Sequence, residues 1–232
     1  MKKFGLIGGV GPESTIEYYR LIIKKYKEIL ETEDYPELLI NIINVRDIIY
    51  CVKNRKLDNL VDILADKITT LETSGVDFGA IAANTPHIVF DRLVERVKLP
   101  LISIVEETCR ELKHKDLKRT LLMGTRFTMT AGFYQKVAGK YGIDLLIPEP
   151  ENREYIHNKY MDELIYNNIL PETKQRLVEI VNEVKKSESL DSVILGGTEL
   201  PLILKQSDFE DIVVLDTTKI HVESIVKRMI ED

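Results

Sequence analysis

The sequence lacks tryptophan, has only two cysteines and contains no long apolar run. Cys51 and Cys109 stand far apart and form no metal-binding motif, so we expect reduced thiols and no metal site. No apolar run reaches the roughly 18 residues that a membrane span requires. The apolar stretch before Gly8 is also too short for a signal peptide. These shortages predict a cytoplasmic protein that makes no membrane contact.

Acidic residues outnumber basic ones, 38 to 32. The 232 residues carry a formal net charge of −6 at pH 7, whereas nucleic-acid binders normally need a basic face, so we expect no nucleic-acid partner. Hydrophobic residues make up 44% of the chain and charged residues 30%, which is the profile of a soluble globular protein. The length suits one large α/β domain or two small ones.

Short apolar runs alternate with longer segments of helical spacing. Amphipathic helices are predicted over 14–30 and 57–74, where apolar residues recur every three or four positions. The predicted strands are Lys3–Ile7, Leu38–Ile43, Phe78–Ala82, Pro100–Ile104, Thr120–Gly124, Asp144–Ile147, Ser192–Gly196 and Ile212–Leu215. Strands that alternate with helices form βαβ units and a largely parallel sheet, so the predicted fold class is α/β.

The two halves of the chain echo each other. The segments 78–108 and 192–221 each contain an apolar strand with small residues at its end, a threonine, a helical return and a second strand. We therefore predict two pseudo-symmetric Rossmann-like lobes with mainly parallel four-stranded sheets, over 1–98 and 99–215, with a helix at 217–231 returning to the first. Ligands of open α/β sheets bind at the carboxyl ends of the strands. Four loops are therefore expected around one cleft between the lobes: 8–15, 83–87, 124–130 and 196–201.

The first of these loops comes close to a dinucleotide-binding motif. Gly9, Val10 and Gly11 fit G-x-G-x-x-G, but Ser14 stands where the third glycine belongs. The second predicted strand also ends without the acidic residue that would bind a ribose. Because N–H groups at a helix start hold small anions, the loop favours a carboxylate or a phosphate over a nucleotide. A glycine turn that serves only the fold is the alternative.

Polar pairs follow small residues at two equivalent strand ends. Asn84 and Thr85 follow one strand, and Thr198 and Glu199 follow the other. Their polar groups suit the α-carboxylate and ammonium of a small ligand, although Asn and Thr at a helix start also cap free N–H groups. Their occurrence at equivalent places in two lobes favours a binding site.

Other polar side chains in these loops have two interpretations as well. Thr125 and Thr128 repeat the hydroxyl pattern in the third loop. Arg46 follows the second strand and suits a bidentate clamp on a second carboxylate, or it is an ordinary surface residue. His87 and His221 could titrate, although histidines at helix starts are more often structural.

Four motifs together resemble the aspartate/glutamate racemase family. They are "IGGVGPEST" followed by "YYR", "ANTPH", "LLMGTRFTMTAGFY" and "VILGGTELP", which occur in the family's order from about Gly5 to His221. This resemblance implies two α/β lobes, a homodimer, no cofactor, and a small acidic amino acid (Asp or Glu) or a dicarboxylate as the ligand. The substrate-binding residues would be Gly9, Val10, Arg46, Asn84, Thr85, Thr125, Thr128, Thr198 and Glu199.

The resemblance also implies a mechanism that this sequence does not fit. Such racemases place one cysteine on each face of Cα, so that one thiolate removes the proton and the opposite thiol returns one. The catalytic cysteine positions, before Asn-Thr and before Thr-Glu, are here Ala83 and Gly197. We therefore expect racemase activity to be weak or absent.

Two further hypotheses stay open. The protein is a non-catalytic binder of acidic amino acids or dicarboxylates, or it is a different isomerase or lyase on the same scaffold. In the second case Glu13, Asp47, His87 or Glu199 would act as the acid or base.

Overall fold

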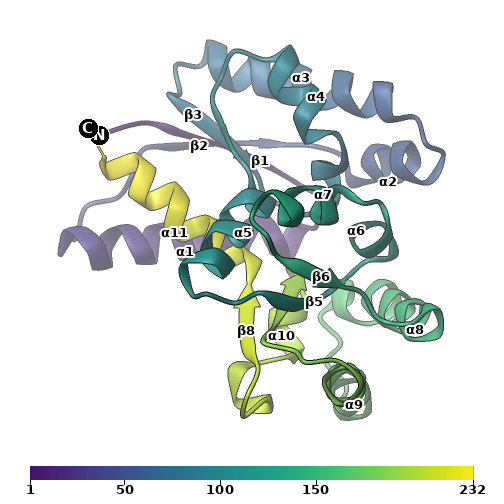
Figure 1. Ribbon diagram of the computed structural model, residues 1–232. Coiled ribbons are helices and arrows are strands. Elements are labelled where there is room, and N and C mark those ends of the chain that lie inside the picture. Colours follow the sequence, from purple (N-terminus) through teal and green to yellow (C-terminus); the bar gives the residue numbers. More distant parts are fainter. Residues whose placement is uncertain (232) are drawn as a thin grey trace. The chain divides into compact units, whose positions relative to one another are not determined.

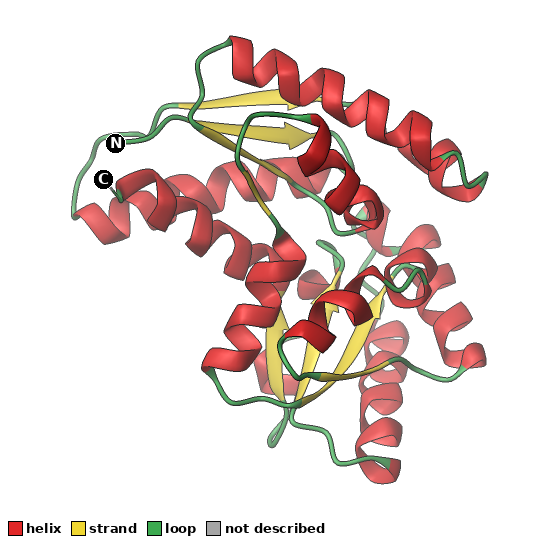
Figure 2. Cartoon of the chain, turned by 45° about the horizontal axis from the view of Figure 1, so that its top comes forward, coloured by secondary structure: helices red, strands yellow, loops and turns green. Residues whose placement is uncertain are grey.

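The computed structural model describes residues 1–231 and divides into two compact units. The first unit contains Met1–Glu107 and takes back the chain from Thr218, whereas the second contains Thr108–Thr217. Each unit holds one four-stranded parallel sheet with helices packed on it (Figures 1 and 2). The segment 99–107 lies in the first unit because its strand pairs with a strand of the first sheet.

The first sheet has the strand order β2-β1-β3-β4, and all its neighbouring pairs are parallel. Its strands are β1 (Phe4–Gly8), β2 (Leu38–Ile42), β3 (Phe78–Ile81) and β4 (Leu101–Ile102). Every residue of β1 and β3 is buried, as expected for central strands of a sheet covered on both faces. Because β1 and β3 are parallel neighbours, the loops at their carboxyl ends lie side by side.

Helices of the first unit pack on this sheet and on each other. They are α1 (Pro12–Leu30), α2 (Val45–Lys53), α3 (Leu57–Thr73), the 3-10 helix η1 (Thr85–Val89), α4 (Phe90–Arg96), the start of α5 (Ile104–His114) and nearly all of α11 (Thr217–Ile230). Figures 1 and 2 show α11 beside α1. Tyr18 and Ile22 of α1 join Val222 and Ile225 of α11 in one buried cluster with Phe4 of β1. Each fully buried aliphatic side chain contributes about 1.5–3 kcal/mol, so this cluster holds the C-terminal helix on the first unit.

The second unit repeats the arrangement, with the strand order β6-β5-β7-β8 and parallel pairing throughout. Its strands are β5 (Arg119–Gly124), β6 (Asp144–Leu146), β7 (Ser192–Gly196) and β8 (Val213–Asp216). Its helices are α6 (Arg126–Thr130), α7 (Phe133–Lys140), α8 (Pro150–Asp162), η2 (Leu164–Tyr166), α9 (Pro171–Ser187), α10 (Leu200–Ile203) and η3 (Gln206–Asp208). The loops after β5 and β7 therefore correspond to those after β1 and β3.

The predicted α/β class with two four-stranded parallel sheets is confirmed, and all eight predicted strands are present with small shifts at their ends. The largest change is at Pro100–Ile104, where β4 covers only Leu101–Ile102. Helix α5 begins at Ile104, and the Ser103 hydroxyl accepts a hydrogen bond from the Glu106 N–H at 3.3 Å, as an N-cap does. Among residues 1–231, no helix combines the length and apolar character needed to cross a membrane.

Candidate active-site loops

The loop after β1 is shaped by glycine. Gly9 has φ +86°, and a Cβ at this position would lie 2.2 Å from the Ile43 carbonyl oxygen, so only glycine fits. The Gly9 N–H donates to the Thr15 hydroxyl at 2.8 Å, which ties the loop to the first turn of α1. Gly11, with φ 100°, precedes α1, and no side chain caps this helix. The first N–H groups of α1 are therefore open to an anionic group.

Helix α1 also fixes the end of β3. The Ser14 hydroxyl donates to the Ala82 carbonyl oxygen at 2.8 Å, and the Ala82 N–H donates to the Ile7 carbonyl oxygen at 2.9 Å. The buried Ser14 and the half-exposed loop at Gly9 thus lie beside the loop that carries Ala83. Both predicted loops of the first unit, 8–15 and 83–87, therefore meet at one edge of its sheet.

The loop after β3 presents small and polar groups. Ala83 is buried, and its methyl group offers no proton acceptor where the resemblance places a thiol. Asn84 is also buried, and its side chain does not cap η1, so the alternative interpretation of Asn84 as a cap does not apply. Thr85 is half-buried at the first position of η1.

His87 serves this loop as a neutral structural residue. One ring nitrogen, Nδ1, lies 2.9 Å from the Ala83 carbonyl oxygen, and the other, Nε2, lies 3.3 Å from the Ile104 N–H. The two partners assign a neutral ring that donates from Nδ1 and accepts at Nε2. Burial lowers the pKa of His87 to about 4, although hydrogen bonds with the backbone of Ala83 and Asn84 act to raise it. Both nitrogens are engaged, so the ring has no free position from which to remove a Cα proton.

Arg46 stands in the first turn of α2 at the carboxyl end of β2. Asn44 caps this helix by accepting a hydrogen bond from the Arg46 N–H at 3.1 Å, and the Arg46 side chain is exposed. Within the described residues no carboxylate pairs with the Arg46 guanidinium. Its charge is therefore available to a ligand. Asp47 and Glu13, both candidate acids or bases, are exposed as well.

In the second unit, Thr125 and Thr128 bond to each other. Thr125 caps α6 by accepting from the Thr128 N–H at 3.3 Å, and the two hydroxyl oxygens are 3.1 Å apart. Thr128 is fully buried, and its methyl group lies 3.0 Å from where a Cβ of Gly124 would be. Thr15 packs in the same way on Gly8, at 2.6 Å. The internal echo of the sequence thus reflects one packing contact, a threonine on a strand-ending glycine, that each unit repeats.

The loop after β7 is built around a buried carboxylate. Glu199 is 4% exposed, and its Oε2 accepts hydrogen bonds from the Thr198 hydroxyl at 2.7 Å and from the Tyr160 hydroxyl. Both donors reach the same oxygen, so in residues 1–231 the other oxygen, Oε1, has no hydrogen-bond partner. Tyr160 comes from α8 and was not foreseen from the sequence, where it looks like an ordinary core residue of a helix. The structure thus adds Tyr160 to the residues predicted around this loop.

The chain resembles known proteins in both sequence and fold. The profile of the Asp/Glu/Hydantoin racemase family matches residues 7–225. A broad specificity amino-acid racemase from Bacillus subtilis is 25% identical over 225 residues, which are 96% of each chain. An aspartate racemase homologue from Pyrococcus horikoshii is 35% identical with a TM-score of 0.88, and a candidate Asp/Glu racemase from Yersinia pestis is 27% identical with a TM-score of 0.92. Both crystal structures cover 100% of this chain and are themselves covered over 100% of their length.

Proposed function

Because this chain belongs to the Asp/Glu/Hydantoin racemase family, we propose that it binds a small acidic amino acid or dicarboxylate at the four predicted loops together with Arg46. The α-carboxylate is held by the N–H groups at the start of α1, and the second carboxylate by Arg46. The open oxygen of Glu199 and the hydroxyl of Thr198 suit the ammonium group. By analogy with the family, we propose that the loops of both units contact this one ligand.

We further propose that racemisation by this protein is weak or absent. The observation that carries this is the pair Ala83 and Gly197, since a methyl group and a hydrogen atom can neither remove nor return a proton. His87, the nearest titratable side chain to Ala83 in the loop, is neutral and bonded at both nitrogens. Loss of a general base typically costs about 10²–10⁴-fold in rate.

Proton NMR of L-aspartate in D₂O tests the catalytic half. We expect the Cα–H signal to persist through long incubation and no D-aspartate to form. Exchange with D-aspartate appearing would show that a base other than a thiol works on both faces and would refute the proposal. The variant A83C is the positive comparison and is tested with L- and D-aspartate, since one thiolate suffices to exchange the Cα proton of the enantiomer that presents it to that face, with the configuration retained.

Thermal unfolding with ligands tests the binding half. A ligand that binds only the folded state raises the melting temperature by mass action. We expect L-aspartate, D-aspartate, L-glutamate or malate to raise it in a concentration-dependent manner, and neutral L-alanine to do so less. If none of the acidic ligands raises it, the proposed ligand class is wrong.

A different isomerase or lyase reaction is the second candidate, and one observation favours it. Glu199 is a buried carboxylate with one free oxygen, which is what a proton-transferring acid or base requires. Such a reaction predicts conversion of a dicarboxylate into a product other than its enantiomer. Incubation with L-aspartate, malate and citrate, followed by mass-resolved chromatography, separates this candidate from simple binding, and E199Q should abolish any conversion that is found.

A further inference from the structure

The space beside Gly197, where the second thiol is missing, is filled by the side chain of Tyr160. A Cβ placed on Gly197 would lie 2.5 Å from Cε2, 2.8 Å from the hydroxyl oxygen and 2.9 Å from Cζ of Tyr160. All three nearest atoms belong to this one ring. Since real Cβ atoms do not approach other heavy atoms so closely, any side chain at residue 197 requires Tyr160 to move.

The Tyr160 ring is held where it is by its own hydrogen bond. It is 6% exposed, and its hydroxyl donates to Oε2 of Glu199, the oxygen that also accepts from Thr198. Burial, together with the charge of Glu199 and the hydrogen bond to it, raises the pKa of the Tyr160 phenol well above its usual range. The phenol is therefore a permanent donor and cannot accept a proton from a substrate at neutral pH.

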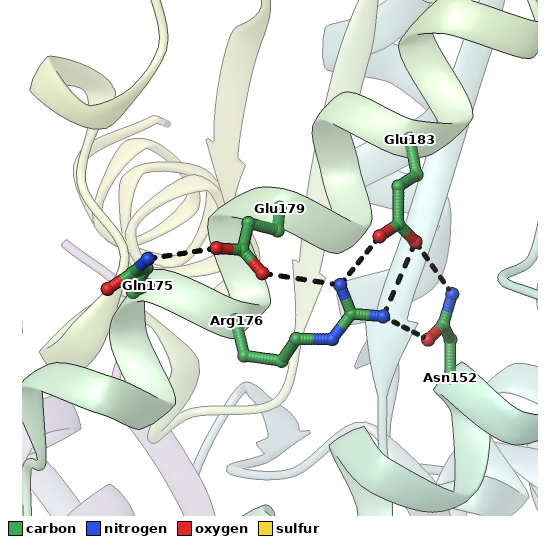
Figure 3. Close-up of polar contacts among 5 residues, drawn as sticks. All are labelled: Asn152, Gln175, Arg176, Glu179 and Glu183. Atoms are coloured by element: carbon green, nitrogen blue, oxygen red, sulfur yellow. Dashed lines mark hydrogen bonds and ion pairs between the residues drawn. The ribbon is translucent and has the colours of Figure 1, made fainter.

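The helix that carries Tyr160 is tied to α9 at both ends. Near the start of α8, the Arg176 guanidinium donates to the Asn152 side chain at 2.9 Å and pairs with Glu183 at 2.6 Å (Figure 3). At the end of α8, the Thr173 hydroxyl donates to Glu163 at 2.5 Å. Movement of the ring by a shift of the whole helix would break both attachments.

We propose that Tyr160 takes the place of the second thiol as a positioning residue that closes this face of the site. Its ring fills the volume left by glycine at residue 197, and its hydroxyl orients Glu199 so that Oε1 faces the ligand. The loop after β7 then contacts a ligand through Thr198 and Glu199, and neither Gly197 nor the Tyr160 phenol in its place can take up a Cα proton as the missing thiol would. This inference rests on the proposed function for the identity of the ligand, but the closure of the thiol position is a property of the folded chain alone.

A stability cycle tests the closure without any ligand. G197A should lower the melting temperature in the wild-type background and in Y160F, because the ring remains. In Y160A the added methyl group enters the vacated volume, so G197A should there be neutral or stabilising. Y155A, which removes a tyrosine from the same helix, is the matched control and should leave the penalty of G197A intact. An equal penalty of G197A in the wild-type, Y160A and Y155A backgrounds would overturn the proposal; should Y160A not fold, Y160L replaces it.

Deuterium exchange tests the functional consequence. The double variant A83C/G197C introduces both thiols, but the second one has to share its volume with the Tyr160 ring and is held out of line with Cα. We therefore expect one-sided exchange, in which the Cα–H of one aspartate enantiomer, L or D, is replaced by deuterium with its configuration retained. Adding Y160A should permit formation of D-aspartate, at least tenfold faster than in A83C/G197C, whereas adding Y155A should not. Equal formation of D-aspartate with and without Y160A refutes the closing role. If no variant binds aspartate, the proposed function fails while the stability cycle still decides the closure.

Discussion

Two buried histidines of the first unit should make its stability strongly dependent on pH. His221 on α11 lies 2.7 Å from the Tyr18 hydroxyl through Nδ1 and 3.1 Å from the Ile102 carbonyl oxygen through Nε2. Burial, and then the neighbouring His87, lower the pKa of His221 to about 3, although the hydrogen bond with Ile102 acts to raise it. The pKa of His87 is lowered to about 4, chiefly by burial. Both side chains are therefore neutral in the folded protein.

The sign of the effect follows from proton binding. Below the usual histidine pKa of about 6.5 the unfolded chain binds protons that the folded chain does not, so stability falls as the pH falls. The contribution of the two neutral histidines to the free energy of unfolding is complete above pH ~6.5. It decreases as the pH falls from there towards the pKa values of the histidines in the folded protein. Between pH 7 and pH 4.5 each histidine accounts for about 2 kcal/mol, and the pair for about 4–5 kcal/mol. Since a whole domain is stable by only about 5–15 kcal/mol, this loss is large.

Urea unfolding followed by circular dichroism between pH 7 and pH 4.5 measures this loss, because the chain has no tryptophan for fluorescence. In H221Q the amide can still donate to Ile102 and accept from Tyr18, so this variant should lose about half of the pH dependence. H114Q is the control, because the His114 side chain is 83% exposed. A free energy of unfolding that stays constant within about 1 kcal/mol from pH 7 to pH 5 would refute the assignment of buried, neutral histidines.

The strands and the internal echo could be predicted from the sequence because each follows from a local packing requirement. Central parallel strands are buried on both faces and therefore appear as short apolar runs, as at Phe4–Gly8 and Ser192–Gly196. The repeated glycine and threonine of the two halves are visible as letters because Thr15 and Thr128 each pack on a glycine that cannot carry a Cβ. Constraints within a dozen residues of one another leave such marks in a sequence.

The neighbour of Gly197 left no comparable mark. Tyr160 lies on α8, where it and Ile156 are the buried residues at helical spacing, a pattern that is typical of any core-facing helix. Its approach to β7 depends on how α8 and α9 pack on the second sheet, which no local pattern specifies. The substitution at residue 197 was visible in the sequence, but the group that fills its place was not.

The protonation and hydrogen bonding of His87 could not be predicted from the sequence either. A histidine three residues after Asn84 has the same appearance whether it is exposed or bonded at both nitrogens. Only the packing of η1 against the start of α5 brings the Ile104 N–H to its ring. Both cases have the same cause: the chemistry of a polar side chain is decided by neighbours that are distant in sequence.

The remaining predictions probe the glycine contacts, a buried hydrogen bond and the ligand clamp. G124A should lower the free energy of unfolding by about 1–3 kcal/mol, because its Cβ would lie 2.8 Å from the Gly196 carbonyl oxygen. G139A in α7 is the comparison: its Cβ would have nothing within 4 Å, so this variant should be about 1 kcal/mol more stable. Equal shifts of the two variants in thermal melts would contradict this. T173V should cost about 1–3 kcal/mol in urea unfolding, because it leaves the buried Glu163 without its 2.5 Å donor, and an unchanged midpoint would count against that bond. R46A should weaken the binding of malate and L-aspartate, measured by calorimetry, by about 10–100-fold, since a charge-assisted hydrogen bond contributes about 1.5–3 kcal/mol. R46K should recover only part of this affinity, because lysine cannot bind a carboxylate through two parallel hydrogen bonds. The matched control is R20A, whose side chain is exposed and pairs with Glu17 on α1; if R20A and R46A weaken binding equally, the effect is one of general charge and Arg46 does not hold the second carboxylate.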